Sequence, residues 1–216
     1  MGKMKNLLLM TLLVLSSFSI SAKQILLGPN SNSQEEIQEA LIDLEPGDVL
    51  TLEPGEYFFE DGISLDVNDV IFEGSGIDNT ILDFGDQVSG AQGLLVTSDG
   101  VTLRDFAVLD AKGDAIKVIG ADGISMIRLK TEWTGGPKET NGAYGFYPVE
   151  SKDVLIDGCV AIGASDAGIY VGQSQNIIVK NSVAQYNVAG IEIENSYYAD
   201  VFDNLASHNT GGILVF

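Results

Sequence analysis

The chain has 216 residues and a formal net charge of −20, from 11 basic and 31 acidic side chains. This excess of acid argues against nucleic acid and anionic membrane surfaces as partners, because both carry negative charge themselves. The single cysteine, Cys159, cannot form a disulfide within the chain, and we expect it to pack as a small apolar residue.

Residues 1–22 predict a secretory signal peptide. Basic Lys3 and Lys5 precede an apolar run over 7–15, and small and polar residues follow as far as Ala22. The apolar run is well short of the roughly 20 residues that a membrane span requires. We therefore expect export to the periplasm or the extracellular space, with no membrane span after the signal is removed.

Residues 23–48 predict an N-terminal cap segment that contains a helix over 33–44. Ser33 and Glu36 have the spacing of a capping box, and a Pro-Gly pair ends the segment. Apolar residues recur at the spacing of one helical face, namely Ile37, Ala40, Leu41 and Leu44. A stack of coils has an open apolar end, so we expect this helix to cover the first coil.

Short runs rich in β-branched and aromatic residues come next and predict strands. In the first part of the chain they are 49–52, 57–58, 63–65, 70–72 and 80–84. From residue 93 onward one strand pattern recurs, mostly at intervals of 22 or 23 residues, at 93–96, 115–118, 145–148, 168–171, 190–193 and 212–215. A second strand in each repeat covers 101–103, 124–126, 154–156, 177–179 and 199–201. This period predicts an all-β fold over 49–216, a parallel β-helix with three strands in each coil.

Alternation within the repeated strands separates the residues that face the interior from those that face outward. The predicted interior residues in the last coils are Ile169, Val171, Ile191, Ile193, Ile213 and Val215. One outward column contains Leu95, Lys117, Tyr147, Tyr170, Glu192 and Leu214, and the next contains Ile119, Val149, Gly172, Glu194 and Phe216. Aromatic rings beside carboxylates suit sugar rings, so Tyr147, Tyr170, Glu192 and Glu194 are candidate ligand-binding residues. The alternative is a tyrosine stack that only stabilises the sheet.

The interval of 30 residues between the strands at 115 and 145 contains an insertion. Its sequence is rich in Gly and Pro over 134–139, which predicts a loop that leaves the stack of coils. Trp133, the only tryptophan, precedes it. Because loops on a rigid scaffold often carry binding sites, we interpret Trp133 and the loop as one wall of a cleft.

The stretch Tyr144-Gly145-Phe146-Tyr147-Pro148-Val149-Glu150 resembles the Tyr-Gly-Phe-Asp-Pro-His-Glu motif of the mannuronan C5-epimerases, which are right-handed parallel β-helix proteins that act on alginate. In this chain Tyr147 and Val149 replace the Asp and His of that motif. The resemblance implies that this Asp and His are the residues on which the family's reaction depends. Abstraction of the C5 proton requires a base, and valine has no titratable atom.

Over most of the chain after the signal, the sequence is similar to exported bacterial β-helix repeat proteins of unassigned function, in the pectin-lyase-like superfamily. The stretches that carry this resemblance are 142–145, 147–151, 166–174 and 189–196, together with the cap helix. The resemblance implies export and a right-handed β-helix, and it implies no known reaction.

Three classes of function remain open. The first is a non-catalytic protein that binds a polysaccharide or a cell-envelope protein along its outward Tyr and Glu residues. The second is a uronate epimerase or lyase with an altered site, in which Tyr144 or Lys117 transfers the proton. The third is a glycoside hydrolase that uses Glu192 and Glu194.

The sequence predicts no cofactor. Ca²⁺ could bridge an acidic protein and an acidic glycan, but no calcium-binding motif is present to support it. The chain ends at Phe216 within a predicted strand, so we expect that the β-helix is truncated at its C-terminal end. His208 lies in a predicted turn, and we interpret it as a surface residue.

Overall fold

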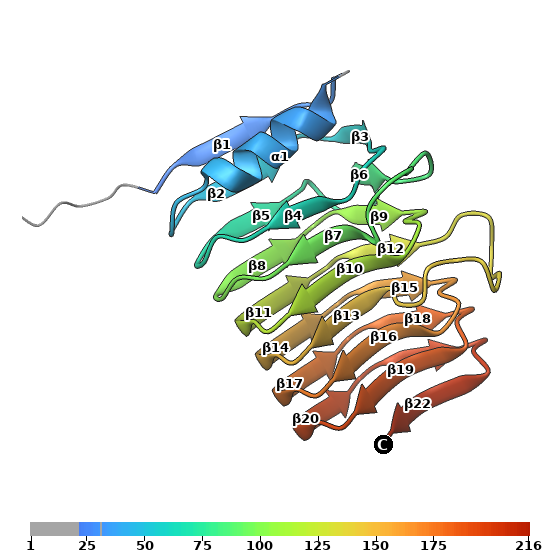
Figure 1. Cartoon of the computed structure of the whole chain (residues 1–216). Helices are drawn as coiled ribbons and strands as arrows, with labels where there is room; N and C mark the ends of the chain where they lie inside the picture. Colours follow the sequence, from blue (N-terminus) through green and yellow to red (C-terminus); the bar gives the residue numbers. More distant parts are fainter. Residues whose placement is uncertain (1–21, 31) are drawn as a thin grey trace, which may run out of the picture.

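The computed structural model describes residues 22–30 and 32–216. The predicted signal peptide therefore lies, apart from Ala22, outside the described residues. Within the described part, no helix is long and apolar enough to cross a membrane. The chain winds into stacked coils that form three parallel sheets, which confirms the predicted all-β parallel β-helix (Figure 1).

Sheet 1 begins each coil and has eight strands. In spatial order they are β1 (Gln24–Leu27), β2 (Val49–Leu52), β5 (Ile71–Glu73), β8 (Val101–Arg104), β11 (Asp122–Ile127), β14 (Lys152–Asp157), β17 (Gln175–Lys180) and β20 (Tyr197–Phe202). The sequence did not predict β1, which pairs with β2 and starts the sheet.

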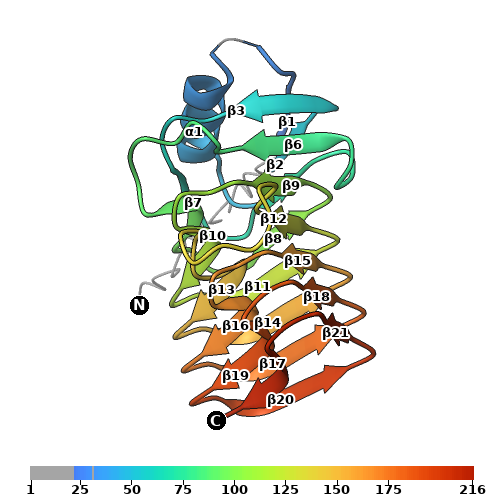
Figure 2. The same ribbon diagram turned by 90° about the vertical axis from the view of Figure 1, so that its right-hand side faces the viewer.

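Sheet 2 has seven strands, which lie one below another in Figure 2. They are β3 (Gly55–Phe58), β6 (Thr80–Asp83), β9 (Ala107–Leu109), β12 (Lys130–Glu132), β15 (Val160–Ile162), β18 (Val183–Gln185) and β21 (Leu205–Ser207). From β9 onward each has three residues and one inward side chain, and the inward residues at the middle of β12, β15, β18 and β21 are small. So short a segment gives little periodic signal, and the sequence did not locate them.

Sheet 3 also has seven strands and contains the strand pattern that revealed the repeat. They are β4 (Ile63–Leu65), β7 (Gln92–Val96), β10 (Asp114–Ile119), β13 (Phe146–Val149), β16 (Ala167–Gly172), β19 (Ala189–Glu194) and β22 (Gly211–Val215).

The coils stack in register, so that equivalent side chains contact each other inside the solenoid. Phe146 pairs with Ile169, Ile169 with Ile191, and Ile191 with Ile213. The first three of these residues are completely buried. Ile213 and Val215, which we expected to be buried, are 46% and 72% exposed because β22 is the edge strand of sheet 3 among the described residues. The register is as predicted, but the predicted burial of these last two residues is wrong.

Gly145 and Gly168, at equivalent positions of two successive repeats, are required because neighbouring groups approach closely at this point. A Cβ atom on Gly145 would lie 2.5 Å from the carbonyl oxygen of Gly168 and 2.5 Å from Thr131 Oγ1. Neither Gly145 nor Gly168 has a positive φ, so the constraint is space rather than backbone conformation. Ordinary side chains at these positions would push the coils apart.

Buried corner residues satisfy backbone groups of the neighbouring coil. The amide of Ser151 donates to Ser174 Oγ at 3.0 Å, and the amide of Ser174 donates to Ser196 Oγ at 3.1 Å. A buried amide without a partner is costly, so this column of serines fixes the corner between sheets 3 and 1.

One helix, α1 (Ser33–Asp43), lies across the top of the stack in Figure 1. It buries Ile37 and Leu41 against the first coil, as the predicted cap requires. The predicted capping box is wrong, because the helix begins at Ser33 itself. The Ser33 hydroxyl accepts a hydrogen bond from the amide of Asn30, and Glu36 accepts one from the Asn30 side chain.

Replacing an interior isoleucine tests the stacking. We expect Ile191→Ala to lower the free energy of unfolding by about 2 to 4 kcal/mol, because it leaves a cavity between two coils. Ile178→Ala makes the same change at a side chain of sheet 1 that is 39% exposed, and it should cost less than about 0.5 kcal/mol. Urea unfolding of both variants provides the measurement, and equal losses would contradict the assigned register.

Candidate functional site

The candidate site lies on the outer face of sheet 3, where strand pairing builds the two predicted columns. Lys117 pairs with Tyr147, and Tyr170 pairs with Glu192. In the next column Val149 pairs with Gly172, and Gly172 pairs with Glu194. The parallel register therefore brings side chains from β10, β13, β16 and β19 onto one surface.

Three tyrosine rings form the centre of this surface, and we call them the tyrosine cluster. Tyr144 precedes β13 and lies with its ring centroid 4.4 Å from that of Tyr147 and 4.8 Å from that of Tyr170. Tyr147 meets Tyr170 edge to face, at 5.1 Å and an interplanar angle of 82°. Such contacts stabilise the rings beyond the area that they bury.

Tyr170 is less accessible than the alternation predicted. It faces away from the interior, but its side chain is only 9% exposed because the other two rings pack against it. Its hydroxyl donates a hydrogen bond to Glu194 Oε2 at 2.5 Å. Burial, and then the negative Glu194, raise the pKa of Tyr170 well above its usual range. The expectation that Tyr170 points into solvent is therefore wrong, and Tyr144 and Tyr147, which are partly exposed, present the accessible rings.

Lys117 is held between a carboxylate and an aromatic ring. Its Nζ lies 3.6 Å from Asp114 Oδ2 and 4.5 Å from the centroid of the Tyr147 ring. Burial raises the pKa of Asp114, and the positive charge of Lys117 opposes that increase. The ammonium group is thus placed by an ion pair and a cation–π contact on the same face as the tyrosine cluster.

Tyr144 remains protonated at neutral pH. Burial, the negative charge of Asp166 and a hydrogen bond to Asp166 together raise the pKa of Tyr144 well above its usual range. The structure thus brings the two candidate proton carriers, Tyr144 and Lys117, to the same face, with Tyr147 in contact with both. A phenol with a raised pKa is a poor base.

Three carboxylates lie near the tyrosine cluster, on β19 and just before β16. Glu192 and Glu194 are partly buried on β19, and Asp166 precedes β16. Burial first, and then the negative charges of Asp166 and Glu194, raise the pKa of Glu192. Among the described residues, no three His, Cys, Asp or Glu side chains are grouped closely enough to hold a metal ion.

Sequence analysis missed Asp114 and Asp166 because alternation fails where the strands of sheet 3 begin. Ala115 and Ile116 are consecutive buried residues, as are Gly145 and Phe146. The chain bends there, so the residue just before each such pair also reaches the outer surface. Asp114 is in register with Tyr144, which was found only through the epimerase-like motif.

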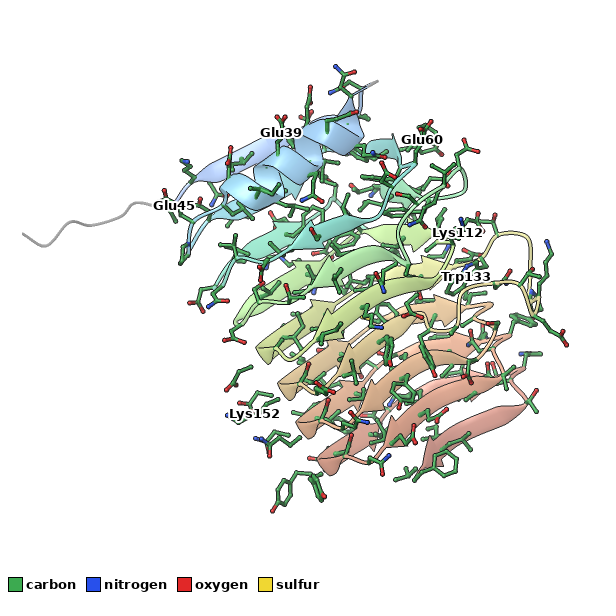
Figure 3. All side chains as sticks on the ribbon, in the orientation of Figure 1. Glu39, Glu45, Glu60, Lys112, Trp133 and Lys152 are labelled. Atoms are coloured by element: carbon green, nitrogen blue, oxygen red, sulfur yellow. The ribbon has the colours of Figure 1, made fainter. Side chains whose placement is uncertain are left out.

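Trp133 is not part of a cleft wall. Its side chain is 5% exposed, and its Nε1 donates to the carbonyl oxygen of Ala111 at 2.8 Å inside the core. Figure 3 shows it at the base of the loop between β12 and β13. A large ring at the point where a loop leaves the stack serves to close the interior, so the predicted ligand contact of Trp133 is wrong.

The loop itself does border a cavity. Pro137, Lys138 and Glu139 line a space of about 310 Å³ together with residues of the next three coils. His208 contributes to its wall and is exposed, as a surface turn residue would be. Cys159 is buried, and burial raises the pKa of its thiol to about 12, as expected for a thiol packed among apolar residues.

Residues 60–216 match the family model described as a right handed beta helix region. A search of curated proteins gave no match. The structure is similar to the A-module of a mannuronan C-5 epimerase from Azotobacter vinelandii, with a TM-score of 0.60 and 19% identity over 85% of this chain and 54% of that one. The chain thus spans about half the length of that module.

Two alginate lyases are also similar in structure. For a PL6 family alginate lyase the TM-score is 0.53 and the sequence identity is 14%. The match covers 88% of this chain and 30% of the lyase. For the alginate lyase from Paenibacillus sp. str. FPU-7 the TM-score is 0.51 and the sequence identity is 14%. The match covers 84% of this chain and 75% of that lyase. At these identities the similarity establishes the fold alone.

The raised pKa of Glu192 predicts a pH-dependent effect on stability. Since the folded protein binds this proton more tightly than the unfolded chain, Glu192 favours folding below its unfolded pKa and opposes folding as pH rises through the folded pKa. Glu192→Gln should therefore raise the free energy of unfolding at pH 7 by a few tenths of a kcal/mol, with no gain below about pH 4.

Urea unfolding at a series of pH values measures this difference. Glu39→Gln, at an exposed position on α1 (Figure 3), provides the control for a loss of one negative charge. A gain for Glu192→Gln that persists at low pH would show that the carboxylate charge is not its cause.

Proposed function

Because the chain belongs to the right-handed β-helix family and carries a tyrosine cluster among carboxylates on one outer face, we propose that this face binds carbohydrate without catalysis. The single observation that carries the proposal is the cluster of Tyr144, Tyr147 and Tyr170 on the outside of sheet 3. Two of these rings, Tyr144 and Tyr147, are partly exposed, so the cluster presents aromatic surface to a ligand.

The chemistry of the face suits a sugar. A pyranose ring has an apolar face that packs on an aromatic ring, and the partly exposed Tyr147 offers such a ring. Its neighbours Tyr144 and Tyr170 fix it from two sides, so little side-chain entropy is lost on binding. The carboxylates of Glu192 and Glu194 can accept hydrogen bonds from sugar hydroxyl groups.

Several features favour binding over proton abstraction. Val149 and Tyr147 occupy the outward positions of the epimerase-like motif at which an imidazole and a carboxylate would be required. The pKa values of Tyr144, Tyr147 and Tyr170 are all raised, chiefly by burial, so none of these phenols loses its proton readily at neutral pH.

The second candidate is a uronate epimerase or lyase with an altered site, and one observation favours it. Lys117 and Tyr144 lie on the same face, each in contact with the ring of Tyr147, and the fold is similar to that of an epimerase and two alginate lyases. In such an enzyme the Lys117 amine would accept the C5 proton and the Tyr144 hydroxyl would donate one.

Hydrolysis by Glu192 and Glu194 has less support. The residues are on one strand, and Glu194 already accepts a short hydrogen bond from Tyr170. Hydrolysis would need one carboxyl group to act as acid and the other to approach the sugar unhindered.

The proposed location is outside the cytoplasm, in the periplasm or beyond the cell, on the basis of the signal-like residues 1–22. The net charge of −20 disfavours unaided binding of an acidic glycan, so a uronate ligand would need a bridging cation such as Ca²⁺. A cell-envelope protein that docks on the same face is the alternative partner.

Removing the partly exposed ring of Tyr147 tests the binding proposal. We expect Tyr147→Ala to weaken binding of the best oligosaccharide from a panel of neutral, amino and acidic glycans about tenfold, equivalent to 1.4 kcal/mol. Tyr198→Ala is the control, because Tyr198 is 83% exposed on sheet 1. Isothermal titration calorimetry, with and without Ca²⁺, gives the affinities. Equal effects of the two changes would contradict binding at the tyrosine cluster.

The same protein should not turn over polymannuronate. In deuterated water we expect no deuterium at C5 by NMR and no unsaturated chain ends by ultraviolet absorbance, because Tyr147 and Val149 stand where the epimerase motif has its Asp and His. Deuterium incorporation that disappears in both Tyr144→Phe and Lys117→Met would instead establish the epimerase or lyase function.

A further inference from the structure

A cavity of about 310 Å³ lies beside the tyrosine cluster, at the corner where sheet 2 passes into sheet 3. Its volume is in the range of small-molecule binding sites. The loop between β12 and β13 forms one wall through Pro137, Lys138 and Glu139, and this loop projects from the side of the stack in Figure 1. The opposite wall comes from the three coils that follow.

The loop is fixed over the cavity by its two ends. The amide of Thr134 donates to Asp110 Oδ1 at 2.8 Å. Asn141 Nδ2 donates to the carbonyl oxygens of Gly136 and Gly163, at 2.9 Å and 2.7 Å. These bonds join the loop to the coils on both sides of it, so the cavity is preformed.

Two rings form the floor of the cavity. Tyr186 and His208 stack with their centroids 4.9 Å apart and an interplanar angle of 25°. Tyr186 is 45% exposed, so its ring is available for contact. A flat aromatic surface beneath a polar loop is an arrangement that holds a sugar ring between an apolar face and hydrogen-bonding groups.

Tyr186 has a left-handed backbone conformation, which disfavours a bulky side chain. Its φ is +59°, and the strand register places it in one column with Asp110 at φ +52°, Trp133, Gly163 at φ +83° and His208 at φ +59°. Glycine and aspartate accept this left-handed conformation readily, whereas a bulky side chain does so at a cost. The same conformation recurs at other corners of the β-helix, for example at Tyr198 and His208, so it belongs to the corner geometry and the case for a site rests on the cavity and the exposed ring.

The strand register places the cavity beside the column of Asp166, next to the tyrosine cluster. Val188 and Thr210, which line it, precede Ala189 and Gly211, and these two are in register with Ala167. Val188 and Thr210 therefore continue the column of Asp166, whose charge and hydrogen bond act on Tyr144. Four residue steps separate that column from Glu192, and they span at most about 13 Å in an extended strand. More than one sugar unit is needed to cover it.

From this geometry we infer that the cavity under the loop is a second subsite for the same glycan chain, in which a sugar unit stacks on Tyr186 while further units reach the tyrosine cluster. The inference rests on the proposed carbohydrate-binding function and extends it. It makes the ligand an oligosaccharide that runs along the strands of sheet 3, from the corner loop toward Tyr147, rather than a single sugar.

Chain length and one variant test the inference. The probes are cello-, manno-, chito- and mannuronate oligomers of two to six units, the last with Ca²⁺, and calorimetry gives each affinity. Tyr186→Asn removes the ring and supplies a residue that suits the left-handed backbone. Tyr198→Asn is the matched control, since Tyr198 has φ +57° on another sheet. Urea unfolding of both variants verifies that each remains folded.

We expect Tyr186→Asn to be at least as stable as the parent and to bind the longest effective oligomer about tenfold more weakly, with binding of the disaccharide unchanged. Tyr198→Asn should change neither affinity. An unchanged long-oligomer affinity in Tyr186→Asn, while Tyr147→Ala lowers it, would overturn the second subsite and leave the proposed function intact. If no oligomer binds the parent protein, both proposals are overturned. A large loss of stability in Tyr186→Asn would show that the ring is structural and would also overturn the subsite.

Discussion

The structure depends on the in-register stacking of one coil on the next. Parallel pairing places Ile169 on Ile191 and Val171 on Ile193, so each apolar side chain rests on an equivalent one and no strand has to bury its face alone. A period of 22 residues is the length that returns the chain to the same sheet. Glycines such as Gly145, where two coils nearly touch, are needed for the same stacking. A side chain there would separate the coils and break the strand pairing.

The same register decides what the outer surface can do. Outward residues of successive coils become neighbours, so the sequence can place an acid next to a base or a ring next to a ring one coil away. Glu73 pairs with Arg104 at 2.5 Å and Asp122 with Lys152 at 3.1 Å in this way on sheet 1. On sheet 3 the equivalent neighbours are tyrosines and carboxylates, which gives that face a different chemistry from the rest of the surface.

The period of the apolar residues was enough to predict the fold and the two outward columns, because both follow from strand alternation and from the repeat. Exposure could not be predicted in the same way. Tyr170 faces outward and is nevertheless buried, since Tyr144 reaches over it from a position where alternation has already failed. Trp133 adjoins an exposed loop in sequence but turns into the core, and only the position of the neighbouring coils decides between these two outcomes.

The insertion between β12 and β13 shows how a β-helix can add a surface loop without interrupting the register of its strands. Although 30 residues separate Ala115 from Gly145 instead of 22, Ile116 still pairs with Phe146, so the extra residues leave the stack and the register continues unchanged. The loop rejoins sheet 3 just before Tyr144, the residue that contacts both other rings of the tyrosine cluster. The loop and the cluster are thus connected by a few residues of backbone and by the hydrogen bonds of Asn141. A change in the insertion would alter the surface at two places at once and leave the core, which is built from other coils, undisturbed.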